Sequence, residues 1–328
     1  MNNQIKDIIY ICDDNYCLPT VVSILSVVNN GINIDGEVSI HVCTFGLSES
    51  NKILLRRIRN NNVRLCIDVF DKCNDRINRI SQKSHVTPSA LIKFELANYF
   101  SNIDQILYLD SDIIVKGDLN KLLEIDITNC YLAASYEFYC HLNRIRYTLH
   151  RSVSNEFYFN SGVMLMNLKK MREDNISDKL WDYKLFKAKT RLMDQECLNA
   201  ICGNSTIHLP IKWNFNPRFL CKIHLDEINR VYLSDYQTVK ELENDVAIIH
   251  YVGKTDKPWV YKNAHMRDYW DNEYKKMEQM PFMNLKESED SVRSFFGSIH
   301  SKLKNYGIVG TLCFILYTIN CKWVNLKK

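Results

Sequence analysis

The chain has 328 residues, of which 46% are hydrophobic and 24% charged, a composition with which a globular protein can bury a sizeable core. Six Lys or Arg residues and no Asp or Glu follow residue 290, so the net charge of +4 becomes −2 (+4 less 6) over the first 290 residues. That charge excludes a body that binds nucleic acid through a basic surface, because only the tail is basic.

The first hundred residues alternate between two patterns. Apolar runs typical of buried strands occupy residues 6–12, 38–43 and 63–69. Apolar residues at helical spacing predict helices at 19–28, 48–58 and 88–99. Repeated strand, helix, strand units predict an α/β fold with a Rossmann-like, doubly wound and mostly parallel sheet.

The rest of the body continues with further predicted elements. We expect strands at 131–135 and 246–250 and helices at 119–123, 176–189 and 194–201. Residues 157–167 are strand-like, and we expect Asn160-Ser161-Gly162 to break the strand in its middle. Residues 141–155 have no periodicity, which predicts a loop or, as an alternative, a lid over an acceptor.

Residues 105–115 contain the main candidate site of the sequence, two carboxylates within an apolar run. An apolar run leads into Asp110-Ser111-Asp112 and then resumes as Ile113-Ile114-Val115. In an extended segment Asp110 and Asp112 would point to the same side, where two carboxylates can bind one hard cation. The alternative is an ordinary Asp-Ser-Asp turn between two strands.

Polar residues also end two other predicted strands. Asp13 and Asn15 follow the first strand, and His250 ends the last one. Because strand ends of a doubly wound sheet can meet at one crevice, we expect these residues near Asp110 and Asp112. Two carboxylates and an imidazole suit Mn²⁺, whereas oxygen-only sets suit Mg²⁺. Such an open site would accept the oxygens of a diphosphate.

Three common motifs are absent from the sequence. It contains no Walker loop, no G-x-G-x-x-G and no G-x-S-x-G elbow. These absences argue against P-loop kinases, dinucleotide dehydrogenases and hydrolases that use such an elbow.

Five short motifs, in order over roughly residues 5–260, together resemble glycosyltransferase family 8. Within that family the chain is similar to the bacterial lipopolysaccharide galactosyl- and glucosyltransferases. The motifs are Cys12-Asp13-Asp14-Asn15-Tyr16, Leu107-Tyr108-Leu109-Asp110-Ser111-Asp112, Phe159-Asn160-Ser161-Gly162-Val163, Asp194-Gln195, and Ile249-His250-Tyr251 with Gly253 and Lys257-Pro258-Trp259. Each motif alone is a weak signal, and five in sequence are a strong one.

The resemblance implies a GT-A fold that binds a UDP-sugar and Mn²⁺ and transfers the sugar with retention of anomeric configuration. The implied metal ligands are Asp110, Asp112 and His250. The implied donor-binding residues are Ile11, Asp13 and Asn15 for uridine and ribose, Lys93 for phosphate or sugar, Gly253 and Lys257 for the diphosphate, Asn160, Ser161 and Gly162 for the sugar, and Ser111.

Asp194 and Gln195 are the implied catalytic residues. Asp194 can accept hydrogen bonds from sugar hydroxyls, and Gln195 would place a neutral amide beside the reacting carbon. A carboxylate nucleophile would allow a double displacement. Because glutamine is a poor nucleophile, we favour front-face attack, in which the leaving phosphate accepts the proton of the acceptor.

The chain departs from the family pattern at two positions. Three residues separate Gly253 from Lys257 where the family usually has two, which leaves Lys254 as an alternative phosphate ligand. Lys93 stands where the family often has arginine, so the charge is kept and the bidentate geometry is lost.

We expect two parts, a catalytic domain over residues 1–280 and a C-terminal tail over 281–328. Apolar residues of 292–303 recur at helical spacing among basic residues, as in helices that lie on anionic membranes. Residues 305–321 are uncharged, but 17 helical residues span only about 25 Å, at the short limit for crossing a bilayer. We therefore favour a tail that lies on the membrane over a spanning one; a packed core helix is the other alternative.

Other features of the sequence indicate the compartment. Twelve cysteines are scattered without a C-x-x-C pair, and the first seven residues lack the apolar segment and cleavage site of a signal peptide. We expect a cytoplasmic protein, peripherally attached to the cytoplasmic face of the inner membrane.

These observations lead to one functional hypothesis and two alternatives. The hypothesis is an Mn²⁺-dependent retaining hexosyltransferase that moves galactose or glucose from its UDP-sugar to a glycan acceptor, such as a lipid-linked core sugar. The first alternative is a nucleotide-sugar hydrolase or nucleotidyltransferase, and the second is a membrane-bound glycan-binding module without turnover.

Overall fold

The structure is a computed structural model that describes residues 6–31, 38–58, 63–70, 76, 88–138, 158–187, 194–222, 224–253 and 257–280. Several predictions concern other residues. They are the loop or lid at 141–155, the role of Lys254, and the tail with its boundary at residue 281. All of these stay predictions.

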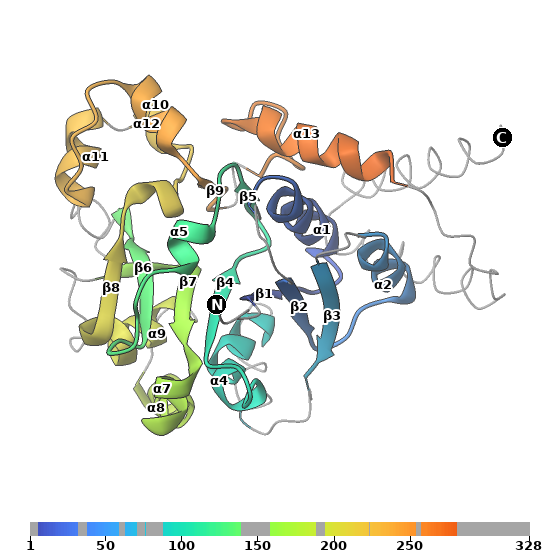
Figure 1. Cartoon of the computed structure of the whole chain (residues 1–328), viewed down its shortest axis with the longest axis vertical. Helices are drawn as coiled ribbons and strands as arrows, with labels where there is room; N and C mark the ends of the chain where they lie inside the picture. The colour runs from blue at the N-terminus through green and yellow to red at the C-terminus, as the bar shows by residue number, and fades with distance from the viewer. Residues whose placement is uncertain are drawn as a thin grey trace, which may run out of the picture. The chain divides into compact units, whose positions relative to one another are not determined.

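Seven strands form the main sheet, in the spatial order β3-β2-β1-β4-β7-β6-β8 (Figure 1). They are β1 Lys6–Ile11, β2 Val38–Thr44, β3 Val63–Val69, β4 Gln105–Leu109, β6 Leu132–Tyr136, β7 Phe159–Asn167 and β8 Thr206–Leu209. Within this sheet β7 runs antiparallel to its neighbours β4 and β6, and the other neighbouring pairs are parallel. The predicted mostly parallel sheet is therefore confirmed. Its strand order reverses between β1 and β4, where open α/β sheets bind ligands.

Two groups of helices pack around the sheet (Figure 1). The helices of the first half are α1 Cys17–Ser26, η1 Val27–Gly31, α2 Glu49–Arg56, η2 Pro88–Phe94, α4 Leu96–Tyr99 and α5 Asn120–Leu123. Those of the second half are α7 Leu168–Glu173, α8 Ile176–Asp182, η4 Tyr183–Lys187, α9 Gln195–Cys202, η5 Gly203–Ser205, η6 Ile211–Trp213, α10 Phe219–Lys222, α11 Leu225–Tyr232, α12 Val239–Asp245 and α13 Arg267–Glu278. α1 contacts α2 and α13, whereas α4, α7, α8 and α9 pack in succession.

Strand β1 shows how the two faces are filled. Ile9 and Ile11 belong to the buried cluster that contains Phe94 and Trp181. Tyr10 points to the opposite face, where its hydroxyl lies 3.1 Å from Oγ of Ser23 in α1. This alternation is the period of two that a strand buried on both faces requires.

The predicted break in strand β7 is wrong in part, because the strand continues but its pairing with β6 is irregular at the predicted place. Residues Phe159–Asn167 form one continuous strand in which Asn160, Ser161 and Gly162 are buried. β4 pairs with the strand on one side and β6 on the other, and the Asp110 amide donates to the Gly162 carbonyl at 2.8 Å. The register with β6 shifts across Asn160-Ser161-Gly162, from Ala134 opposite Met164 to Tyr136 opposite Phe159, so the local sequence produces an irregularity in the pairing and not an end of the strand.

The single helix predicted at 88–99 is also wrong in part. The segment is a 3₁₀ helix, η2, followed by the short α-helix α4, with Glu95 between them. Leu91, Ile92, Lys93 and Phe94 are all buried, so η2 is enclosed around its circumference. Because residues 91–94 are all buried, their sequence has no alternation of apolar and polar faces. The apolar pattern therefore cannot distinguish a 3₁₀ helix from an α-helix here.

The predicted strand at the end of the body lies outside the main sheet. β9, Ile248–His250, pairs antiparallel with β5, Ile113–Val115, in a separate two-stranded sheet. Ile113 lies opposite His250, and the Tyr251 amide donates to the Asp112 carbonyl at 3.0 Å. This register brings His250 beside the turn that contains Asp112.

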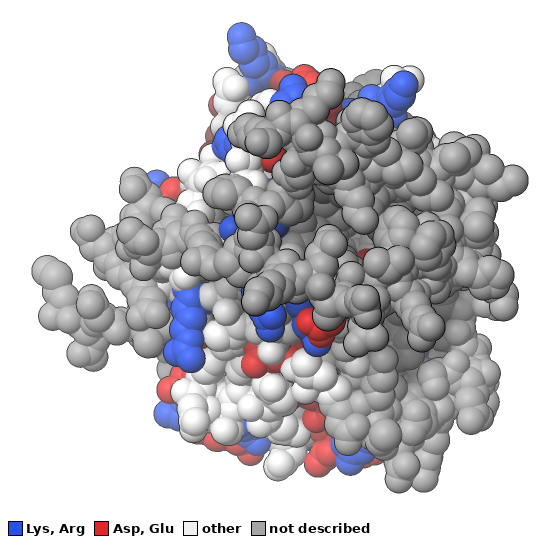
Figure 2. Space-filling model, turned by 90° about the vertical axis from the view of Figure 1, so that its right-hand side faces the viewer, with Lys and Arg blue, Asp and Glu red and all other residues white. Residues whose placement is uncertain are grey.

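The described surface carries mixed charge, and one face is drawn in Figure 2. On that face Lys and Arg atoms lie beside Asp and Glu atoms over the described part of the body (Figure 2). Among the described helices we find none with the length and apolar character needed to cross a bilayer.

Candidate active site

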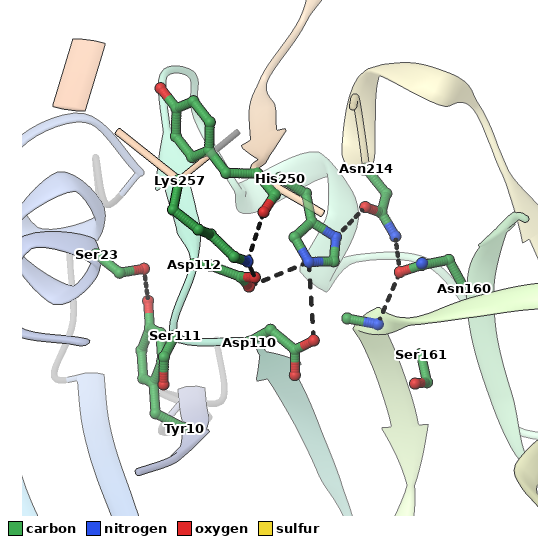
Figure 3. A network of polar contacts seen from close by, with 12 residues as sticks. Tyr10, Ser23, Asp110, Ser111, Asp112, Asn160, Ser161, Asn214, His250 and Lys257 are labelled. Carbon is green, nitrogen blue, oxygen red and sulfur yellow. Dashed lines mark hydrogen bonds and ion pairs between the residues drawn. The ribbon is translucent and has the colours of Figure 1, made fainter. Parts of the chain in front are cut away.

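Asp110, Asp112 and His250 converge at the junction of the two sheets (Figure 3). Asp110 follows β4, Asp112 lies in the turn before β5, and His250 ends β9. One ligand atom from each lies within 4.8 Å of the others. Nε2 of His250 is 3.1 Å from Oδ1 of Asp112 and 3.7 Å from Oδ2 of Asp110. The Asp-Ser-Asp segment is thus a turn between strands, and it still brings both carboxylates to one point.

Two features of this site fit a bound cation. Oδ1 of Asp112 is buried and accepts no hydrogen bond from the described residues. A Cβ at Gly162 would lie 2.1 Å from Cε1 of His250 and 2.9 Å from Oδ2 of Asp110, so the position leaves no room for a side chain. Two carboxylates and one imidazole form a donor set that suits a divalent ion such as Mn²⁺.

Lys257 is buried against the same turn. Its ammonium contacts Oδ2 of Asp112 and donates to the Tyr251 carbonyl at 2.6 Å. Burial alone would raise the pKa of the Asp112 carboxyl, but Lys257 and His250 outweigh it and hold that pKa well below its usual range. Gly253, in the loop between His250 and Lys257, has φ +92°, which favours glycine.

Lys93 joins the cation site to the predicted catalytic pair. Its buried ammonium is 2.5 Å from Oδ2 of Asp194 and 3.4 Å from Oδ1 of Asp110, above the ring of Tyr108. Burial alone would lower the pKa of Lys93, but the two carboxylates outweigh it and raise that pKa. Burial would likewise raise the pKa of Asp194, and Lys93 lowers it instead. Both groups are therefore charged at neutral pH.

The start of α9 lies against β7, which brings together the residues predicted for the sugar pocket. Oγ of Ser161 donates to Oδ2 of Asp194 at 3.2 Å, and the Ser161 amide donates to Oε1 of Gln195 at 3.1 Å. Oδ1 of Asn160 accepts from the Gly162 amide at 3.0 Å. This geometry leaves Nε2 of Gln195 as the end of its amide that can donate to a ligand.

The residues predicted for uridine and ribose lie in and after β1. Oδ1 of Asp13 accepts from the amides of Asn15 at 2.9 Å and Tyr16 at 3.1 Å, and burial raises the pKa of Asp13. Oγ of Ser111 donates to the Ile11 carbonyl at 3.0 Å. These contacts tie the loop after β1 to the turn that carries Asp110 and Asp112.

Sequence reasoning missed three polar residues of the site. The Tyr108 hydroxyl donates to Oδ1 of Asp110 at 2.5 Å, Glu137 accepts from Nδ2 of Asn160 at 2.8 Å, and Asn214 lies 2.8 Å from Nδ1 of His250. Tyr108 could have been found, because it precedes Asp110 by two positions and a strand aligns such residues on one side. Asn214 offered a weaker signal, an amide between Trp213 and Phe215, both of which are buried.

Comparison with known proteins gives the family. A sequence model of glycosyl transferase family 8 matches residues 7–263. The chain is 27% identical to a lipopolysaccharide 1,2-glucosyltransferase of Escherichia coli, over 80% of this chain and 76% of that protein. It is also 27% identical to a lipopolysaccharide 1,3-galactosyltransferase of Salmonella typhimurium, over 77% of this chain and 72% of that protein.

Solved structures share the fold. The galactosyltransferase LgtC, solved in complex with donor and acceptor sugar analogs, gives a TM-score of 0.64 at 24% identity, over 88% of this chain and 99% of LgtC. The bifunctional glycosyltransferase WbbM gives 0.66 at 21% identity over 84% of this chain, which spans half the length of WbbM. The fold is therefore of the GT-A type. Since the family model matches most of its length, the chain belongs to glycosyl transferase family 8.

Proposed function

We propose that this glycosyltransferase moves galactose or glucose from a UDP-sugar to a saccharide acceptor with retention of anomeric configuration, assisted by Mn²⁺ or, less well, Mg²⁺. The observation that carries the proposal is the convergence of Asp110, Asp112 and His250 beside Lys257. Two carboxylates, an imidazole and an ammonium at the switch point of an α/β sheet suit a metal–diphosphate complex.

The donor would lie across the carboxyl ends of β1 and β4. Ile11, Asp13 and Asn15 would bind the uridine and ribose, with Ser111 beneath them. Gly253 and Lys257 would bind the diphosphate. A divalent ion held by Asp110, Asp112 and His250 would neutralise the charge of the leaving diphosphate. Lys257 would then exchange its contact with Asp112 for one with phosphate.

The sugar would lie between β7 and the start of α9. Lys93, Asn160, Ser161 and Gly162 would line its pocket, and Asp194 and Gln195 would flank the reacting carbon. Oδ2 of Asp194 is already shared between the Lys93 ammonium and the Ser161 hydroxyl, which weakens it as a nucleophile. This arrangement supports front-face attack over a double displacement through Asp194.

The acceptor class is proposed from the relatives. The similarity to transferases named for lipopolysaccharide supports a lipopolysaccharide or lipooligosaccharide core, or another surface glycan, presented at a membrane. The basic amphipathic tail would bind the cytoplasmic face of the inner membrane, because its lysines would meet anionic lipid headgroups.

Deletion of the residues after Glu289 tests the tail. We expect the shortened protein to leave the membrane fraction while UDP-sugar hydrolysis persists, since the proposed site lies wholly before residue 281. Sedimentation with membranes at low salt is the measurement. A shortened protein that still sediments with membranes would show that the tail is not the attachment.

A transfer assay tests the reaction. Purified protein is incubated with UDP-galactose or UDP-glucose, with and without a lipopolysaccharide acceptor, over a Mn²⁺ titration, and the products are analysed for anomeric configuration. We expect a glycoside with the configuration of the donor, formed only with metal. Free sugar alone, even with acceptor, would indicate the hydrolase. Nucleotide transfer would indicate a nucleotidyltransferase, and binding without turnover a glycan-binding module.

A further inference from the structure

A chain of buried hydrogen bonds ends on His250 (Figure 3). The Gly162 amide donates to Oδ1 of Asn160 at 3.0 Å, and Nδ2 of Asn214 donates to the same oxygen at 3.0 Å. Oδ1 of Asn214 lies 2.8 Å from Nδ1 of His250. The exposed fractions of Asn160, Asn214 and His250 are 9%, 5% and 3%, so water does not compete freely for these groups.

The backbone places Asn214 beside His250. The segment from Trp213 to Phe215 runs along β9, because the Phe215 amide donates to the Ile248 carbonyl at 3.0 Å and the His250 amide donates to the Phe215 carbonyl at 2.8 Å. These bonds fix the backbone at residue 214, and the bond from Nδ2 of Asn214 to Asn160 holds its side chain toward the imidazole. Its side chain is buried beside the imidazole by the path of the chain.

The direction of every bond in this chain follows from one backbone amide. An N–H group can only donate, so the atom of Asn160 that faces the Gly162 amide is the amide oxygen. The group of Asn214 that meets this oxygen must then be its NH₂, and its oxygen faces Nδ1 of His250. An amide oxygen can only accept, so Nδ1 carries the hydrogen.

The other end of Asn160 supports the same orientation. Its Nδ2 donates to Oε2 of Glu137 at 2.8 Å, and a carboxylate can only accept. One hydrogen of this NH₂ remains for a sugar hydroxyl. The oxygen of Asn160 therefore orients Asn214, which contacts the imidazole, and the nitrogen of Asn160 can donate to the proposed sugar.

We propose that Asn214 is a positioning residue that holds His250 in the tautomer with the proton on Nδ1. Nε2 then faces Oδ1 of Asp112, 3.1 Å away, where a proton or a metal ion can lie between the two atoms, and a metal ion can replace that proton without any change at Nδ1. Without Asn214 the proton would move to Nε2 and donate to Asp112. The imidazole would then block the cation position that it otherwise completes. The metal part of this inference rests on the proposed function, whereas the tautomer does not.

The tautomer can be observed in the metal-free protein. Two-bond ¹H–¹⁵N NMR correlations on protein labelled with ¹⁵N-histidine distinguish Nδ1–H from Nε2–H, and the His250 signals are assigned by their loss in His250→Gln. We expect Nδ1 to carry a hydrogen in the wild type at pH 8 and to carry none in Asn214→Leu. Asn214→Ala removes the same acceptor without adding apolar volume and makes the same comparison if the leucine variant is unstable.

Asn216→Leu is the matched control. Asn216 is 6% exposed, and the hydrogen bond of its side chain is local, with Oδ1 accepting from the Arg218 amide at 3.1 Å. We expect Mn²⁺ affinity, followed by the electron paramagnetic resonance of free Mn²⁺, to fall by about 10- to 100-fold in Asn214→Leu. In Asn216→Leu we expect it to stay within about twofold of the wild type, because the side-chain hydrogen bond of Asn216 is local and does not reach the proposed ligands.

The outcomes separate this inference from the proposed function. A wild type whose Nδ1 carries no hydrogen, or Nδ1–H retained in Asn214→Leu with wild-type Mn²⁺ affinity, would overturn the inference. Equal losses in Asn214→Leu and Asn216→Leu would overturn it too, because the effect would then come from packing. A wild type that shows Nδ1–H, loses it in Asn214→Leu and binds no Mn²⁺ would support the positioning role and overturn the proposed function instead.

Discussion

Two histidines of the described residues each contact two aspartates, and the aspartates are arranged differently around the two rings. His41 in β2 lies between Asp7 of β1 and Asp68 of β3, with Nε2 3.2 Å from Oδ1 of Asp7 and Nδ1 2.9 Å from Oδ2 of Asp68. Each ring nitrogen thus has its own carboxylate. A ring that donates from both nitrogens carries a positive charge, which makes His41 the centre of an ion triplet across three strands.

At His250 the carboxylates lie on one side of the ring. Asp110 and Asp112 both face Nε2, whereas Nδ1 faces the neutral amide of Asn214. The second ring nitrogen therefore has no carboxylate of its own, and both carboxylates lie around Nε2. One histidine and two aspartates form an ion triplet at one place and the proposed cation site at the other. The partner of the second ring nitrogen, rather than the number of carboxylates, distinguishes the two.

Removing one carboxylate from each site should give the largest difference in activity between the two sites. We expect Asp112→Asn to lower kcat/KM for sugar transfer by about 10³-fold, because it removes a metal ligand and with it several kcal/mol of charge stabilisation. Asp68→Asn should leave kcat/KM within about twofold while lowering the midpoint of thermal unfolding, because it removes half of the ion triplet. If both variants lose activity alike, His41 is not merely structural.

Filling the space beside His250 should give the next largest loss of activity. In Gly162→Ala the new Cβ would meet the imidazole and the Asp110 carboxylate, so the ring must shift. Displacing a catalytic group by about 1 Å costs roughly 100-fold in rate, and we expect a loss of that size in sugar transfer. Gly203→Ala is the control, because its Cβ would meet nothing within 4 Å. A Gly162→Ala variant with full activity would show that the site does not require the space that glycine leaves beside His250 and Asp110.

The charge of His41 should appear as pH-dependent stability. Burial alone would lower the pKa of His41, but hydrogen bonds with Asp68 and Asp7 outweigh it and raise the pKa from 6.5 to about 9. The folded pKa lies above the unfolded one, so the stabilisation is complete below pH 6.5 and is lost as pH rises through 9. We expect the free energy of unfolding to fall by about 1–3 kcal/mol over that window.

Urea unfolding at pH 6 and at pH 9.5 measures this loss. His41→Gln keeps a hydrogen-bonding side chain without the charge, so its stability should change less over the same interval. If the wild type and His41→Gln lose the same amount, the pH dependence arises elsewhere in the chain.

The smallest effect concerns Lys257, which forms an ion pair with Asp112. Lys257→Met should raise the affinity for Mn²⁺ alone by roughly five- to tenfold, as loss of an ion pair worth about 1 kcal/mol predicts. The same change should weaken UDP binding, because the proposed phosphate contact is lost. Calorimetric titration with each ligand measures both affinities. Changes of the same sign would contradict an exchange of Lys257 between Asp112 and phosphate.

The sequence predicted the regular half of the fold well. The strands at 6–12, 38–43 and 63–69 are β1, β2 and β3 to within a residue, because buried parallel strands are apolar runs bounded by turn residues. The helix predicted at 194–201 is α9, shifted by one residue. Local periodicity sufficed for these elements because their burial is simple, on one helical stripe or on both faces of a strand.

The second half depends on contacts that are distant in sequence. β7 continues past its irregular stretch because β6 pairs with it on both sides of that stretch and β4 pairs with residues 163–167. β9 leaves the main sheet because its partner is β5, more than 130 residues earlier. The convergence of Asp110, Asp112 and His250 was predictable from strand ends and motifs. Asn214 was not, because its position beside His250 follows from the path of residues 213–215 along β9.

Crystals grown with Mn²⁺ and UDP would test the central claim most directly, through an anomalous difference map collected at the manganese edge. The account predicts one strong peak bonded to Asp110, Asp112 and Nε2 of His250, and none between Asp7, His41 and Asp68. UDP bound beside Lys257 with no manganese at His250, or manganese at His41 instead, would contradict it.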